Sequence, residues 1–201
     1  MMNETKSTPA SIGGILLAAG KSSRFGQMKQ LINYHGKPLI RYIAKTALTA
    51  GLSPVIAVTG FEAASVTQAI EDLPITITLN HRWQDGQSSS LQAGLRCMPK
   101  GTSAVLFLLV DQPQVTVSLI KALSRFFDAE KAPIIAPIVN GQRTNPVLFE
   151  KVTFPELMKI RGDVGGKMIF DKFEEKFLPW HDERLLLDLD TPDDINKILY
   201  S

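Results

Sequence analysis

The sequence predicts an α/β fold: a doubly wound, mostly parallel sheet with helices on both faces. Short apolar runs alternate with segments of helical periodicity, which is the pattern of strand–helix–strand units. The 201 residues suit a single core, and no repeat, linker or low-complexity segment divides them. Ligands of such folds bind in the crevice beyond the carboxyl ends of the strands. The loops that follow the predicted strands are therefore the first place to look for a site.

The alternation begins at residues 12–18, a continuous apolar run that suits a strand buried on both faces. Residues 38–50 follow as a helix, with proline at its start and glycine just past its end. The β-branched strand pattern returns at 55–59 and 75–79, with a helix predicted over 62–73 between them. A further helix is expected over 88–98, where serines can cap the start.

Residues 104–110 are the most hydrophobic strand candidate, and we expect them at the centre of the sheet. The elements expected after them are a helix over 117–128, a strand over 134–139, an Asn140-Gly141 turn, an apolar segment over 146–149, a helix near 166–173, a strand near 185–187 and a terminal helix from Thr191-Pro192. Residues 1–11 are polar and are expected to form a flexible tail. Residues 12–201 then form one domain.

The composition excludes several classes of protein. Hydrophobic residues make up 44% and charged residues 21%, which is ordinary globular usage. A formal charge of +2 is too small to indicate a nucleic-acid partner. The strongest apolar run, 104–110, falls well short of the roughly 20 residues that span a bilayer, so no membrane association is expected. The single cysteine, Cys97, suits a reducing compartment, and the expected location is the cytoplasm.

The segment 17–29 has the chemistry of an anion-binding loop. It leaves the carboxyl end of the first predicted strand, is rich in small residues and carries three cations. Its glycines let backbone N–H groups approach phosphate oxygens, while Arg24 and Lys29 can balance the charge of a triphosphate. A P-loop is excluded, because that motif needs glycine where Ile15 stands, and the loop glycines lack dinucleotide spacing. The alternative is a loop that is glycine-rich only to turn the chain.

This loop and several later segments together resemble a known family. The segments are Leu17-Ala18-Ala19-Gly20, Ser23-Arg24-Phe25-Gly26, Lys29, Asn80 with Trp83, 86–91, Asp111-Gln112-Pro113, 145–149, 162–167 and 188–192. In this order they are similar to the MobA/MocA-like nucleotidyltransferases, in particular to the molybdenum cofactor cytidylyltransferases. The likeness runs from about residue 12 to 195. It implies a Rossmann-like fold of the nucleotide-diphospho-sugar transferase type, dependence on Mg²⁺ and transfer of a nucleoside monophosphate.

The resemblance also divides the chain into a nucleotide-binding half, 12–115, and an acceptor-binding half, 116–201. The residues implied for the nucleotide are Leu17, Ala18, Ala19, Gly20, Ser23, Arg24, Lys29, Gln87, Ser88 and Ser90. Those implied for the acceptor are Arg143, Asn145, Asp163 and Lys167. The family frequently has histidine where Asn145 stands, so this chain lacks a titratable imidazole at that position. Ser88, Ser90 and their neighbour Ser89 have capping of the following helix as an alternative role.

Asp111 is the first candidate metal ligand, because it follows the predicted central strand and Mg²⁺ on a phosphate substrate is usually held by one or two carboxylates. Its alternative role is to cap the helix that follows. Asp188 and Asp190 alternate with leucines in a strand-like run, so both point to one face and either can be a second ligand. The resemblance favours Asp190. Catalysis is expected to depend on Arg24, Lys29 and Asp111.

The implied reaction transfers CMP from CTP to the phosphate of a molybdopterin-type acceptor and releases pyrophosphate. CTP is preferred to GTP because Ala18-Ala19-Gly20 resembles the cytidylyl branch, whereas guanylyl enzymes usually have a second glycine in this turn. Two alternatives stay open: an NAD(P)H-dependent oxidoreductase on the same scaffold, and a non-catalytic carrier of molybdenum cofactor. The expected protein partner is a molybdoenzyme or its maturation chaperone, and the chain itself is expected to be a monomer or a weak dimer.

Overall fold

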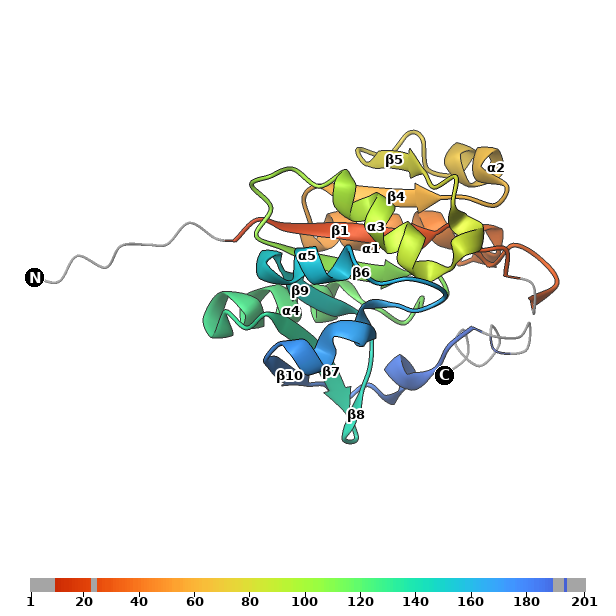
Figure 1. The fold of residues 1–201 in the computed structure, drawn as a ribbon. Coiled ribbons are helices and arrows are strands. Elements are labelled where there is room, and N and C mark those ends of the chain that lie inside the picture. Colours follow the sequence, from red (N-terminus) through yellow and green to blue (C-terminus); the bar gives the residue numbers. More distant parts are fainter. Residues whose placement is uncertain (1–9, 23–24, 190–193, 195–201) are drawn as a thin grey trace, which may run out of the picture.

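The fold is built on a central sheet that crosses the whole molecule (Figure 1). The computed structural model describes residues 10–22, 25–189 and 194. Within this part of the chain the sheet has eight strands, with β8 (Gln142–Arg143) paired to β7 off the main path. The order along the path is β10 (Glu175–Pro179), β7 (Ile134–Val139), β9 (Val147–Glu150), β6 (Ala104–Leu109), β1 (Ile12–Ala18), β4 (Val55–Thr59) and β5 (Thr76–Leu79).

Most strand pairs of this sheet are parallel, as predicted. β1 lies between β4 and β6 and is parallel to both, β4 is parallel to β5, and β7 is parallel to β10. β9 runs antiparallel to β6 and β7, and β8 forms a hairpin with β7. Leu17 of β1 pairs with Leu109 of β6. The loops that follow these two strands therefore leave the sheet side by side.

Helices cover both faces of the sheet. The α-helices of the described residues are α1 (Leu39–Ala50), α2 (Ala63–Gln68), α3 (Gln87–Arg96), α4 (Val117–Glu130) and α5 (Phe154–Leu157). α1, α2 and α4 pack on one face with the apolar core that contains Leu16, whereas α3 and α5 pack on the other face with Ile15. Neighbouring residues of β1 enter different cores because successive side chains of a strand point to opposite faces.

Shorter elements connect these layers. A two-stranded hairpin, β2 (Asn33–Tyr34) with β3 (Lys37–Pro38), precedes α1. The short 3₁₀ helices are η2 (Lys29–Leu31), η3 (Trp83–Asp85), η4 (Lys151–Thr153), η5 (Gly166–Lys172) and η6 (Glu183–Leu186). None of the helices in the described part of the chain has the length and apolar character needed to cross a membrane.

The continuous apolar runs were the reliable predictors. The strands over 12–18, 55–59 and 134–139 are confirmed to the residue, and β6 lies in the middle of the sheet path as expected. α1 begins after Pro38 and ends at Ala50. The next residue, Gly51, has a φ of 91°, the left-handed conformation that glycine adopts without strain. The helix predicted over 62–73 is shorter, 63–68, and the one near 166–173 is a 3₁₀ helix.

In the last third of the chain one strand prediction is wrong, and one strand was not predicted. The strand near 185–187 is the 3₁₀ turn η6, because the Asp182 carboxylate accepts a hydrogen bond from the Arg184 N–H at 3.1 Å and starts a turn there. The strand at this edge of the sheet is β10, whose sequence is too polar for the apolar-run criterion. The tail over 1–9 and the terminal helix expected from Thr191-Pro192 lie outside the described residues.

Candidate active site

Two neighbouring cavities open at the carboxyl ends of β1 and β6. The first, of about 310 Å³, is lined mainly by the loop after β1, the start of α3 and Asp111, and we call it the polar cavity. The second, of about 350 Å³, is lined by three phenylalanines and by residues of the second half of the chain, and we call it the aromatic cavity. Leu17, Gln87 and Leu109 line both cavities. A ligand in one therefore lies next to a ligand in the other.

The loop after β1 is held in place by a buried glutamine. The Gln30 amide donates through Nε2 to the carbonyl oxygens of Ala18, at 3.1 Å, and of Gly20, at 2.6 Å. Ala19, Gly20 and Lys29 line the polar cavity. A Cβ at Gly20 would meet no atom within 4 Å, so the space beside this backbone is open to a ligand. Ser23 and Arg24, also predicted for this loop, lie outside the described residues.

Lys29 and Asp111 form an ion pair in the wall of the polar cavity. Lys29 Nζ is 3.4 Å from Asp111 Oδ2, and the two side chains are 12% and 34% exposed. Burial is the largest effect on the Asp111 carboxyl and raises its pKa, the nearby Lys29 ammonium lowers the pKa, and Asp188 raises it. Asp111 does not cap α4: that role belongs to Thr116, whose Oγ1 accepts from the Leu119 N–H at 3.2 Å. The capping alternative for Asp111 is therefore excluded.

Asp188 lies close enough to Asp111 to affect its pKa. Its Oδ1 accepts a hydrogen bond from Gln112 Nε2 at 2.7 Å. The described residues contain no group of three or more His, Cys, Asp or Glu side chains that could hold a metal by themselves. Two carboxylates, with phosphate and water oxygens completing the shell, are nevertheless the donor set that Mg²⁺ commonly takes on a phosphate substrate. The other candidate, Asp190, lies outside the described residues.

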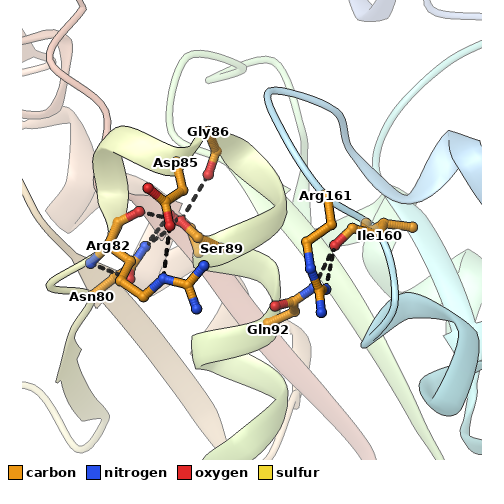
Figure 2. Close-up of polar contacts among 9 residues, drawn as sticks. Asn80, Arg82, Asp85, Gly86, Ser89, Gln92, Ile160 and Arg161 are labelled. Atoms are coloured by element: carbon orange, nitrogen blue, oxygen red, sulfur yellow. Dashed lines mark hydrogen bonds and ion pairs between the residues drawn. The ribbon is translucent and has the colours of Figure 1, made fainter.

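The start of α3 is built differently from the prediction (Figure 2). Ser88, Ser89 and Ser90 lie inside the first turn and are buried, and none of them caps the helix. Ser89 Oγ donates to the carbonyls of Arg82 and Gly86, both at 2.8 Å, while Asn80 Nδ2 donates to Ser89 Oγ and Ser90 Oγ. The serine-cap prediction is wrong because Gly86 holds the capping position. Ser90 still lines the polar cavity.

The N-terminus of α3 is capped from a distant loop. Asp163 Oδ1 accepts from the Gln87 N–H at 3.1 Å, and the Gly162 carbonyl accepts from the Ser88 N–H at 3.3 Å. Gly86 allows this close approach: its φ is 93°, and a Cβ there would lie 2.4 Å from the Asp163 backbone nitrogen. The loop before Gly162 is anchored in turn by the Ile160 carbonyl, which accepts from Gln92 and Arg161 (Figure 2).

The structure separates the four residues predicted for the acceptor. Arg143, Asn145 and Lys167 line the aromatic cavity together with Phe107, Phe149 and Phe170. Asp163 lines the polar cavity instead. The Arg143 guanidinium lies 3.8 Å from the centre of the Phe170 ring, and its Nη1 is 2.6 Å from Glu175 Oε2. The aromatic cavity thus combines flat apolar walls with two cationic side chains.

Sequence reasoning missed two residues of the polar site, Gln30 and Gln112. Each is buried, and each follows a residue that was predicted to act, Lys29 or Asp111. Each donates through Nε2 to a neighbouring segment that lines or flanks the polar cavity. Their place directly after a candidate residue was the available signal. Nothing in the sequence distinguishes a buried glutamine of this kind from the exposed glutamines that are common on protein surfaces.

Residues 14–177 match the MobA-like NTP transferase domain. The chain belongs to this family. Membership agrees with the Rossmann-like α/β fold. The matched region contains the loop after β1 and nearly all of the strands of the sheet.

Curated relatives of this MobA-like domain carry several functional names. Nicotine blue oxidoreductase of Paenarthrobacter nicotinovorans is 29% identical, with 94% of this chain and 96% of that protein covered. Purine catabolism protein PucB of Bacillus subtilis is also 29% identical, covering 92% and 94%. A probable molybdenum cofactor guanylyltransferase of Bacillus cereus is 28% identical, covering 67% and 65%.

Solved structures confirm the fold. Rv0371c of Mycobacterium tuberculosis has a TM-score of 0.84 and 26% identity, covering 96% of this chain and all of that one. A second structure of Rv0371c, in complex with manganese, has a TM-score of 0.81 and 25% identity, with the same coverage. CMP:2-keto-3-deoxy-manno-octonic acid synthetase in complex with CTP has a TM-score of 0.76 at 13% identity, covering 94% and 97%, and shows the shared fold alone.

Proposed function

We propose that this MobA-like domain transfers a nucleoside monophosphate, CMP from CTP, to the phosphate of a molybdopterin-type acceptor. One observation carries the proposal: a polar cavity lined by Lys29 and Asp111, with the Asp188 carboxylate near Asp111, adjoins an aromatic cavity that has two cationic side chains. The two cavities share residues of their walls. Family membership and a relative named molybdenum cofactor guanylyltransferase support it. The domain then works as a donor half, 12–115, and an acceptor half, 116–201.

The donor triphosphate binds in the polar cavity. The loop after β1 offers its backbone, and the Lys29 ammonium neutralises phosphate charge. Asp111 and Asp188 would hold the divalent metal, Mg²⁺ in this proposal. The manganese complex of a 25% identical neighbour supports the use of a divalent metal. When bound, the metal supplies charge neutralisation at the phosphates and orients them. The sequence also proposes Arg24 as a catalytic residue and Asp190 as a metal ligand. Both lie outside the described residues.

The acceptor binds in the aromatic cavity. A flat heteroaromatic ring such as a pterin fits walls made by Phe107, Phe149 and Phe170, while Arg143 and Lys167 attract the anionic phosphate. The acceptor phosphate oxygen attacks the α-phosphorus, a new P–O bond forms, and the bond to pyrophosphate breaks. No protein base is required, because the phosphate is already ionised. The protein contributes alignment and neutralisation of charge.

The choice of cytosine rests on the loop after β1 and on the start of α3. Ala19 is buried and lines the polar cavity at the turn where guanylyl enzymes usually have a second glycine. Gln87 and Ser90 offer an amide and a hydroxyl that can read the edge of a base. We therefore expect CTP to bind more tightly than GTP. We also propose a cytoplasmic location and delivery of the product to a molybdoenzyme or its chaperone.

The test is pyrophosphate release with CTP, GTP, ATP or UTP, each with molybdopterin as acceptor, with and without Mg²⁺. We expect release with CTP and Mg²⁺, and little with the other nucleotides. Release with GTP alone would overturn the cytidylyl assignment but keep nucleotidyl transfer. The relative named nicotine blue oxidoreductase favours an oxidoreductase as the second candidate. If no nucleotide gives pyrophosphate release and NADPH binds tightly, the chain is an oxidoreductase. If the chain delivers molybdenum cofactor without turnover, it is a carrier.

A further inference from the structure

The segment that carries Asp188 is fastened to the loop after β6 by three hydrogen bonds. Gln112 Nε2 donates to Asp188 Oδ1 at 2.7 Å, and the Leu189 N–H donates to the Asp111 carbonyl at 3.2 Å. The third bond runs from the Gln114 amide to the Leu187 carbonyl. Leu187 and Asp188 are exposed, whereas Gln112 and Gln114 are 3% and 7% exposed. A buried amide thus fixes an exposed carboxylate.

The stability of the fold does not account for an amide at position 112. Its Oε1 is buried and has no hydrogen-bond partner among the described residues. A buried polar oxygen without a partner costs free energy, and an apolar side chain of the same length would avoid that cost. What glutamine adds over such a side chain is the Nε2 donor, and the donor is directed at one oxygen of Asp188. The second oxygen, Oδ2, is not used by this bond.

We propose that Gln112 is a positioning residue: its amide holds the Asp188 carboxylate beside Asp111, so that both carboxylates face one divalent cation. This inference rests on the proposed function, which assigns a metal to these two residues. Hydrogen bonds that orient a metal-binding carboxylate typically change metal affinity 10- to 100-fold when they are removed. The Gln112 side chain acts through Asp188 and does not itself bind the metal.

The test measures Mn²⁺ binding by the whole chain, from the loss of the free Mn²⁺ signal in electron paramagnetic resonance. Gln112→Met keeps the length of the side chain and removes the donor, and we expect it to weaken Mn²⁺ binding about 10- to 100-fold. The matched control is Gln92→Met. Gln92 is also buried and donates through Nε2 to a carbonyl, that of Ile160 at 2.8 Å, but it lines neither cavity. This control should leave Mn²⁺ affinity unchanged.

A double-variant cycle separates positioning from a general structural effect. In an Asp188→Asn background we expect Gln112→Met to have no further effect, because the carboxylate that it positions is gone. Two results would overturn the inference and leave the proposed function intact. In the first, Gln112→Met weakens Mn²⁺ binding equally with Asp188 and with Asn at position 188. In the second, Gln112→Met binds Mn²⁺ as tightly as wild type although Asp188→Asn binds it weakly. Failure of the wild-type chain to bind Mn²⁺ would overturn the proposed metal site itself. If Gln112→Met does not fold, Gln112→Leu is tested with the same outcomes.

Discussion

At the scale of single residues, the polar cavity is defined by how its charges are paired. Lys29 lies within reach of Asp111, and Asp188 adds a second negative charge nearby. Burial and the neighbouring carboxylate both raise the pKa of Asp111, which means that its charged form lacks full compensation within the protein. A cation brought by a ligand would supply that compensation. The same geometry makes Asp111 the residue whose loss should be most specific to catalysis.

We expect Asp111→Asn to lower turnover about 100-fold or more, because the substitution removes an anionic oxygen from the proposed metal site. The fold should survive, since Thr116 and not Asp111 caps α4 and since the substitution also relieves repulsion with Asp188. The measurement is pyrophosphate release at saturating Mg²⁺, with circular dichroism as a check on folding. Near-normal turnover of a folded Asp111→Asn protein would place the metal elsewhere.

Sequence reasoning reached the residues whose chemistry is visible in a short motif. The polar cavity is lined by Lys29 and Asp111, and the aromatic cavity is lined by three of the residues predicted for the acceptor. The buried amides of Gln30 and Gln112 were missed, because their role depends on which distant backbone or carboxylate they meet. Asp163 was assigned to the acceptor but lines the polar cavity, since its loop folds back over α3.

At the scale of elements, burial on both faces decides what the sequence can predict. β1, β4 and β7 are continuous apolar runs, so their bounds were predictable. β10 is an edge strand with two charged residues among five, and its place depends on pairing with β7 rather than on its own pattern. The serine-rich start of α3 has the composition of a cap, yet the loop at 162–163 supplies the capping atoms.

The Asp163 cap gives a prediction for α3. We expect Asp163→Ala to destabilise the fold by about 1 kcal/mol, the usual cost of removing a capping carboxylate from a helix N-terminus. It should also raise the KM for CTP, because Gln87 follows directly from the capped turn and lines the polar cavity. Urea unfolding and steady-state kinetics measure the two effects. A stability loss without any change in KM would show that the cap does not shape the nucleotide site.

A second prediction concerns how α1 is held against the turn after α2. Arg41 binds Asp72 through two hydrogen bonds of 2.5 and 2.7 Å and also donates to the Ala69 carbonyl. The bond to Arg41 lowers the pKa of Asp72 from 3.8 to about 2. A lowered carboxyl pKa contributes stability that is present above the unfolded value of 3.8 and is lost as the pH falls through about 2.

Asp72→Asn should therefore lower the thermal midpoint modestly at pH 7. The difference from wild type should shrink below pH 4 and disappear as the pH falls through about 2. We expect a modest change in the thermal midpoint because the side chains of Arg41 and Asp72 both reach solvent. Thermal unfolding of the two proteins across this range measures the effect, with Asp171→Asn as the control for removing an exposed aspartate. A difference that stays constant with pH would show that the carboxyl charge is not what joins the two elements.

At the scale of the whole molecule, the topology brings distant segments to one edge of the sheet. β1 and β6 end level with each other, so Gly20 and Lys29 of the loop after β1 lie near Asp111 there. The antiparallel β9 lies beside β6 and carries Val147 and Phe149 into the aromatic cavity. The halves also exchange residues, since Phe107 lines the aromatic cavity and Asp163 lines the polar cavity. A substitution at a residue that lines only one cavity should therefore affect the binding of one ligand. A substitution at a residue that lines both cavities should affect the binding of both ligands.

This arrangement predicts three distinct kinetic results from three alanine variants. Lys29→Ala removes a cation from the triphosphate and should lower kcat with every acceptor, while Asn145→Ala should mainly raise the KM for the acceptor. Gln87→Ala alters the wall that both cavities share and should raise both KM values. Steady-state kinetics with CTP and acceptor varied separately distinguishes these cases. If Asn145→Ala weakens CTP binding and leaves the acceptor KM unchanged, Asn145 belongs to the donor side. If Gln87→Ala changes only one KM, the wall that the two cavities share does not couple the two ligands.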